Sequence, residues 1–163
     1  DLPEVNIGLS FMADEELEVT NAIMYRYDNW VENDITYMEV AMYEFVSNEQ
    51  AEEYMAYLVE VGEAYYAFLK VDKTDRQFLP DDRMLGKVED ENSYLLMIDF
   101  EEVEKGVESM YAYRDENQIM EVRFNGYEYN EIYPQYEKFA KKMKFEGLND
   151  IKLEYAEPQS GDE

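Results

Sequence analysis

Apolar side chains recur at the spacing of an amphipathic α-helix between Ser47 and Leu69. Ser47 is followed three residues later by Gln50, which together make the capping box that marks the start of a helix. The predicted apolar side consists of Ala51, Tyr54, Met55, Leu58, Val61, Gly62, Tyr65 and Leu69. The opposite side carries Glu49, Glu52, Glu53, Glu60 and Glu63. This pattern predicts a helix over residues 48–69.

The segments around this helix have the pattern of β-strands. In residues 20–28, Ile23, Tyr25 and Tyr27 fall on one face, which we expect to pack in the core or against a neighbouring strand. Residues 35–46 are apolar on both faces, as in an inner strand, and a longer loop joins the two segments into a hairpin. Further strands are predicted at 94–100, 108–114, 118–125 and 151–155, with Asp115-Glu116-Asn117 closing a second hairpin. Residues 70–93 are predicted to be a long loop or to contain a short strand.

A second helical pattern follows the later hairpin. Asn130 is the candidate cap, Pro134 fits the first turn, and Gly147 marks the end beyond a Lys-rich last turn. Its apolar stripe is Ile132, Tyr136, Phe139, Ala140 and Met143. We expect the polar, acidic residues 156–163 to form a flexible tail.

The order of these elements indicates an α+β fold. We expect one domain over residues 1–155, with a mainly antiparallel sheet and two principal helices packed on one face. The segments 20–69 and 108–146 resemble each other, for example at residues 24–28 and 110–115, which predicts a duplicated β-β-α unit. Chance similarity in a chain rich in Met, Tyr and Glu is the alternative.

The composition excludes several kinds of chemistry. The 163 residues include no Cys and no His, so disulfides, thiolate nucleophiles, Ser-His-Asp triads and His- or Cys-ligated zinc are excluded. The sequence also lacks a phosphate-binding loop and a Gly-x-Ser-x-Gly elbow. With 40 acidic residues, a carboxylate pair for glycoside hydrolysis can be chosen almost anywhere and indicates little. We therefore expect a non-catalytic protein without a cofactor, and a carboxylate-dependent enzyme is the least favoured reading.

Carboxylates between Val71 and Ser93 raise the question of a calcium site. The segment lacks the spacing of an EF-hand loop, and Lys and Arg residues are interspersed with the acids. We therefore predict a solvated loop and no metal site.

The net charge of −26 restricts the classes of partner that this protein can bind. Sixteen acidic residues and one basic residue, Arg26, lie within residues 1–69. Such a charge disfavours direct contact with nucleic acid or anionic lipid, and no apolar stretch approaches the roughly 20 residues of a membrane span. We expect a basic protein surface to contact the N-terminal half. The alternative is that the acidic face is exposed to solvent and binds no partner. The predicted contact residues are Trp30, Glu49, Glu52, Glu53, Glu60 and Glu63, with Trp30 expected in a turn.

Two functions are therefore open from the sequence. The first is an acidic binding or structural protein, for which the start at Asp1-Leu2-Pro3-Glu4 rather than Met predicts a removed targeting segment and an extracytoplasmic or secreted location. The second is a cytoplasmic nucleic-acid mimic, whose carboxylates would stand where phosphates bind an inhibited DNA-binding protein.

The predicted helix face yields the first test. Leu58→Ala should lower the free energy of unfolding by about 2–5 kcal/mol, because it removes a buried side chain and leaves a cavity. Glu60→Ala, on the acidic side, should change that free energy by less than about 0.5 kcal/mol. Urea denaturation of both variants measures the difference, and equal small effects would show that the face is misassigned.

Overall fold

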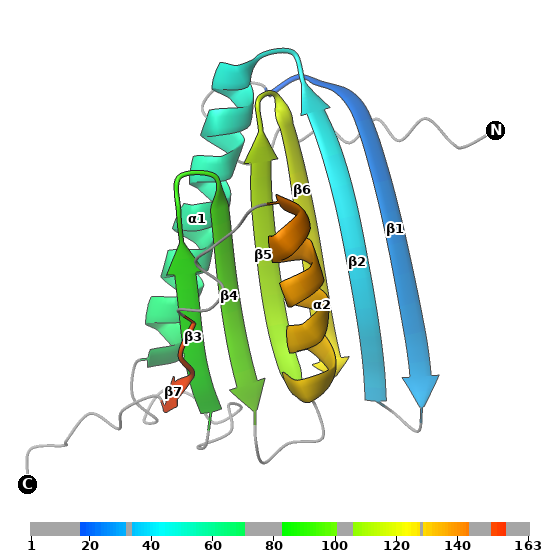
Figure 1. Cartoon of the computed structure of the whole chain (residues 1–163), viewed down its shortest axis with the longest axis vertical. Coiled ribbons are helices and arrows are strands. Elements are labelled where there is room, and N and C mark those ends of the chain that lie inside the picture. The colour runs from blue at the N-terminus through cyan, green and yellow to red at the C-terminus, as the bar shows by residue number, and fades with distance from the viewer. Residues whose placement is uncertain are drawn as a thin grey trace, which may run out of the picture.

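A computed structural model describes residues 17–31, 34–70, 83–100, 106–127, 129–143 and 151–155. Within these residues the elements are β1 (Val19–Val31), β2 (Asp34–Phe45), α1 (Asn48–Lys70), β3 (Arg83–Glu89), β4 (Ser93–Phe100), β5 (Val107–Asp115), β6 (Gln118–Tyr127), α2 (Tyr129–Met143) and β7 (Glu154–Tyr155). The strands form one antiparallel sheet in the order β1-β2-β6-β5-β4-β3-β7 (Figure 1). The predicted α+β class with a mainly antiparallel sheet is confirmed.

The helices lie on opposite faces of the sheet, so the expectation that both cover one face is wrong (Figure 1). Strand β4 shows why. Tyr94, Leu96 and Ile98 belong to the core beneath α1, whereas Leu95 and Met97 belong to the core beneath α2. Successive side chains of a strand point to opposite faces, so an uninterrupted apolar run must be covered on both sides. The β1-β2 and β5-β6 hairpins are each followed by a helix, and the duplicated unit stays a prediction.

The β1-β2 hairpin joins the β5-β6 hairpin where β2 pairs with β6. The predicted turn of the second hairpin is confirmed: Asp115 pairs with Gln118, and Glu116 adopts the left-handed conformation at φ 52°. Asn117 Nδ2 donates to the carbonyl oxygen of Phe45 over 2.7 Å, and the Phe45 amide donates to the Asn117 carbonyl over 2.8 Å. These two bonds hold the turn of one hairpin against the end of the other.

Both ends of α1 are tied to other segments. Ser47 Oγ accepts from the Gln50 amide over 3.3 Å, as the capping box requires, but Gln50 Oε1 accepts from the amide of Glu18 over 2.9 Å instead of closing the box. At the other end, Arg83 of β3 is buried and its Nε donates to the carbonyl oxygen of Leu69 over 2.8 Å. A guanidinium at this position satisfies an orphan carbonyl and complements the negative end of the helix dipole. Of the predicted apolar side of α1, Val61 is the exception, with 42% of its surface exposed.

The remaining elements agree with the sequence in part. Helix α2 is confirmed and buries Ile132 and Tyr136, but it begins at Tyr129, so Asn130 is not its cap and Pro134 lies beyond its first turn. The short strand allowed within residues 70–93 is β3, and the predicted strand 151–155 is reduced to β7. The side chains of Phe139, Ala140 and Met143, Gly147 and the predicted tail lie outside the described residues.

Gly62 permits the close approach of α1 to β4. A Cβ at this position would lie 2.5 Å from Cε1 of Tyr94, whose side chain is fully buried. Alanine favours a helix interior by about 1 kcal/mol over glycine, whereas overpacking a core costs about 1–3 kcal/mol. The rigid Tyr94 ring cannot turn aside without leaving its site, so the steric cost should prevail.

Gly62→Ala is therefore expected to lower the melting temperature, against the direction of helix propensity. Ala67→Gly, at an exposed position of the same helix, provides the reference for propensity alone. A thermal melt in which Gly62→Ala is more stable than the wild type would contradict this packing.

Candidate functional site

An acidic groove lies between α1 and the connection from β3 to β4. It encloses about 400 Å³ and has a floor of Met55, Ala56 and Val59. Its charged lining consists of Glu52 and Glu60 from α1, Glu89 at the end of β3, Asp90 and Glu91 from the connection, and Arg114 from β5. Five carboxylates therefore face one guanidinium over an apolar floor, and we call this feature the acidic groove.

Arg114 holds the two sides of the acidic groove together. Its Nη1 lies 3.2 Å from Glu52 Oε1, and its Nη2 donates to Asn92 Oδ1 over 3.2 Å. The connection is itself a hydrogen-bonded turn, in which the Asp90 amide donates to the Ser93 carbonyl over 3.0 Å and Asp90 Oδ1 accepts from the Asn92 amide over 2.9 Å. The carboxylates at residues 89–91 are thus presented by an ordered turn opposite the helix.

The structure brings two of the predicted contact residues, Glu52 and Glu60, into the acidic groove. Glu63 turns toward β3 instead, where it forms an ion pair with Lys87 and accepts from the Tyr94 hydroxyl over 3.3 Å. Lys87 also lies 4.8 Å from the centre of the Tyr66 ring. Glu63 is therefore bound within the chain and is poorly placed to meet a partner.

The other predicted contact residues lie elsewhere. Glu53 is exposed on α1. Glu49 is exposed in the first turn, where hydrogen bonds from its backbone amide and then from Ser47 lower the pKa of its carboxyl group. Trp30 lies in β1 paired with Ile35, not in a turn as expected, because the strands of the first hairpin extend farther than their sequence pattern indicates.

A buried polar network, which no sequence motif indicates, holds α1 to the sheet. Glu121 of β6 is 4% exposed, and its Oε1 accepts from the Tyr54 hydroxyl over 2.6 Å. Its Oε2 accepts from Nη2 of Arg123 over 2.9 Å. Burial and the nearby Glu121 carboxylate raise the pKa of Tyr54. Pairing of this kind is what makes a charge inside a protein tolerable.

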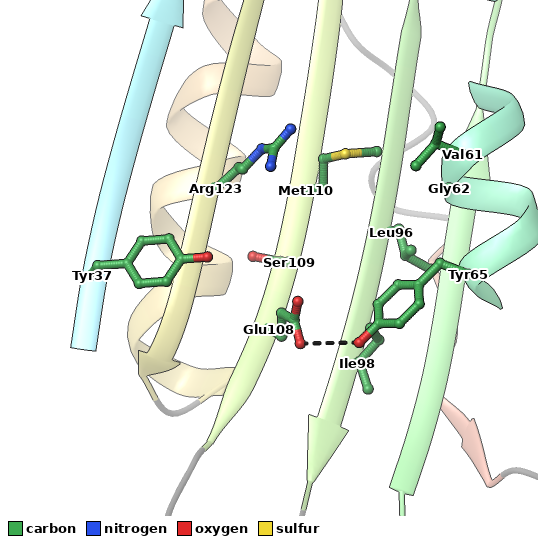
Figure 2. Close-up of a pocket in the computed structure, with 10 residues that line it drawn as sticks. All are labelled: Tyr37, Val61, Gly62, Tyr65, Leu96, Ile98, Glu108, Ser109, Met110 and Arg123. Atoms are coloured by element: carbon green, nitrogen blue, oxygen red, sulfur yellow. Dashed lines mark hydrogen bonds between the residues drawn. The ribbon is translucent and has the colours of Figure 1, made fainter. Parts of the chain in front are cut away.

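A second cavity, which we call the tyrosine pocket, opens beside α1 on the same face of the sheet (Figure 2). It encloses about 170 Å³, and Figure 2 shows Tyr37 of β2 and Tyr65 of α1 on opposite sides of it. Glu108 and Met110 come from β5 and Arg123 from β6. The Tyr65 hydroxyl donates to Glu108 Oε2 over 3.4 Å. Sequence reasoning missed this cavity, because its polar residues are dispersed over four elements.

An apolar surface lies on the α2 face of the first hairpin. Ile23, Tyr25 and Tyr27 pair across the strands with Met42, Val40 and Met38, respectively. The expected common face is thus confirmed, but Tyr25 is 60% exposed and Ile23 and Tyr27 are also exposed, so these side chains are not core residues. The reason is that β1 is an edge strand and neither helix contacts it closely.

Comparison of this chain with protein-family models, curated proteins and solved structures gives no match. No helix among the described residues is long and apolar enough to cross a membrane. Within that same part of the chain, no three acidic side chains are grouped closely enough to hold a metal ion.

The buried tyrosines make stability depend on alkaline pH. Burial first, and Glu121 or Glu108 second, raise the pKa of Tyr43 and Tyr65 to about 12. A phenol with a raised folded-state pKa stabilises the fold fully below the unfolded pKa of about 10. That stabilisation is lost as the pH rises from about 10 through 12, because the unfolded chain releases its protons first.

We therefore expect the free energy of unfolding to fall between about pH 10 and 12. Tyrosinate absorbance of the folded chain should show a fraction of tyrosines ionising later than in the urea-unfolded chain. A single common titration near pH 10 in both states would contradict the burial of these hydroxyls.

Proposed function

We propose that the protein is a non-catalytic binding protein that takes a basic segment of a partner protein into the acidic groove. The observation that carries the proposal is the excess of five carboxylates over one guanidinium around the apolar floor. Lys and Arg suit such a site, because their aliphatic stems cover apolar surface while the charged ends reach carboxylates. A segment with basic and apolar residues would use both parts of the groove.

The charge of the whole chain supports this proposal. With a net charge of −26, the protein attracts a basic partner from a distance and so raises the association rate. The position of the partner within the groove would depend on the individual carboxylates. Glu52 is already neutralised by Arg114 on one side of the groove. This leaves Glu60, Glu89 and Glu91, all exposed, as the carboxylates best placed for a partner's cations.

The nucleic-acid mimic remains a second candidate. Glu49, Glu53 and Glu60 are exposed and fall on one side of α1, spaced by four and seven residues, which is about 6 and 10 Å along a helix axis. A row of this kind can imitate a line of phosphates. The mimic does not explain the apolar floor of the groove, and the neighbouring Glu52 and Glu63 are paired with cations of this chain. We therefore favour the binding protein over the mimic.

The groove is tested by two variants of equal charge. The groove variant carries Glu60→Gln, Glu89→Gln and Glu91→Gln, and the control variant carries Glu18→Gln, Glu137→Gln and Glu154→Gln at other exposed positions. The probe is a synthetic peptide with alternating Lys and Leu residues, and stopped-flow fluorescence measures its association. We expect the groove variant to bind at least about tenfold more weakly than the control variant, a difference of about 1.4 kcal/mol.

Salt should slow association with the wild type, because the Debye length shrinks from about 10 Å at 0.1 M to about 3 Å at 1 M. Equal losses in the two variants would mean that only the net charge attracts the peptide. That outcome, or binding that is indifferent to both sets of substitutions, would remove the acidic groove as the site.

A further inference from the structure

The tyrosine pocket has the features of a small-molecule site and is separate from the acidic groove. Leu96 and Ile98 are buried in its floor, and Met110 adds an apolar wall. Two side chains of opposite charge, Glu108 and Arg123, line the same cavity. Small-ligand sites are typically of this kind, mostly apolar with a few polar groups that orient the ligand.

The side of the pocket near Tyr65 suits an ammonium group. Figure 2 shows the Glu108 carboxylate facing the Tyr65 hydroxyl, from which it accepts a hydrogen bond. The rings of Tyr37 and Tyr65 stand on either side, and aromatic rings attract cations placed near their faces. A carboxylate combined with aromatic walls is a chemistry that favours a protonated amine over a neutral group.

The side formed by Arg123 suits an anion. Nη2 of its guanidinium donates to Glu121, whereas Nε is buried and has no acceptor within the described residues. The side chain is 43% exposed and lines the cavity. Figure 2 shows it extending from β6 toward Met110. A guanidinium binds carboxylate oxygens in particular, because its planar donors match their geometry.

The two charges lie close enough to act on one ligand. The hydroxyl of Tyr37 is influenced by both: after burial, Glu108 raises its pKa and Arg123 lowers it. Figure 2 shows this hydroxyl directed into the space between β2 and β5. Glu108 pairs with Asn125 and Met110 pairs with Arg123 across β5 and β6, so Glu108 and Arg123 are diagonal neighbours on the same face of the sheet.

We propose that the tyrosine pocket binds a small aliphatic α-amino acid, with its ammonium group at Glu108, its carboxylate at Arg123 and its side chain on the apolar floor. The size of the cavity agrees with this class. A cavity of about 150 Å³ holds a ligand as large as benzene, so 170 Å³ suits a molecule of about six to eight non-hydrogen atoms. This proposal is independent of the acidic groove and needs no partner protein.

Calorimetry with three probes tests the requirement for both charges. L-valine carries both groups, isobutylamine lacks the carboxylate, and isovalerate lacks the ammonium group. L-valine should bind the wild type saturably and raise its melting temperature, and each single-charge analogue should bind at least about tenfold more weakly. No binding of L-valine, L-alanine or L-leucine at millimolar concentration would overturn the proposal and leave only water in the pocket. Equal binding of the three probes would also overturn it.

Two further variants locate the binding. Val61→Trp places a large ring at the exposed wall of the pocket, and Ala67→Trp places the same ring at another exposed position of α1 as the control. Val61→Trp should abolish L-valine binding, whereas Ala67→Trp should keep it. Glu108→Gln should weaken it at least about tenfold while the melting temperature without ligand stays close to that of the wild type. Full binding by Val61→Trp would place any amino-acid site elsewhere and overturn the proposal.

Discussion

The burial of β4 on both faces is the constraint from which the arrangement of this protein follows. Tyr94, Leu96 and Ile98 need cover on one side of the sheet, and Leu95 and Met97 need cover on the other. Two helices on one face would leave the second set in water at about 25 cal/mol for each Å² of apolar surface. The structure avoids this cost by placing α1 and α2 on opposite faces (Figure 1).

The position of α1 creates both candidate sites. The helix approaches β4 closely because Gly62 leaves room for the Tyr94 ring, and it is held laterally by the bond between Tyr54 and the buried Glu121. Residues on one side of α1, such as Glu60, form a wall of the acidic groove, whereas Val61 and Tyr65 form a wall of the tyrosine pocket. One packed element thus supports two sites of different chemistry.

Some acidic side chains of α1 are ion-paired with cations of the sheet, and others line the acidic groove. Glu52 and Glu63 of α1 are engaged by Arg114 and Lys87, both of which come from the sheet. These exposed or half-exposed pairs contribute little to stability, but they neutralise part of the acidic surface of α1. The excess negative charge is concentrated in this way at the rim of the groove, where Glu60 stands opposite the turn at residues 89–91.

Most of the local structure follows from residues that are neighbours along the chain. The capped amphipathic pattern after Ser47 gave α1, the hairpin turn at Glu116 was marked by its polar residues, and the α+β class followed from the order of the elements. These features depend on neighbours along the chain, which a sequence displays directly. The extra length of β1 beyond residue 28 depended on pairing with β2 and was missed.

The buried faces, the sheet edges and the candidate sites depend on contacts between segments that are distant in the sequence. Tyr25 and Tyr111 stand in similar sequence contexts, yet Tyr25 is exposed on edge strand β1 and Tyr111 is buried in central strand β5. Arg83 looked like a loop cation and proved to be the buried cap of α1, while Glu121 proved to be paired inside the core. In each case the outcome depends on which distant segment covers the residue, because burial and pairing are set by contacts across the sheet and not by the adjacent sequence.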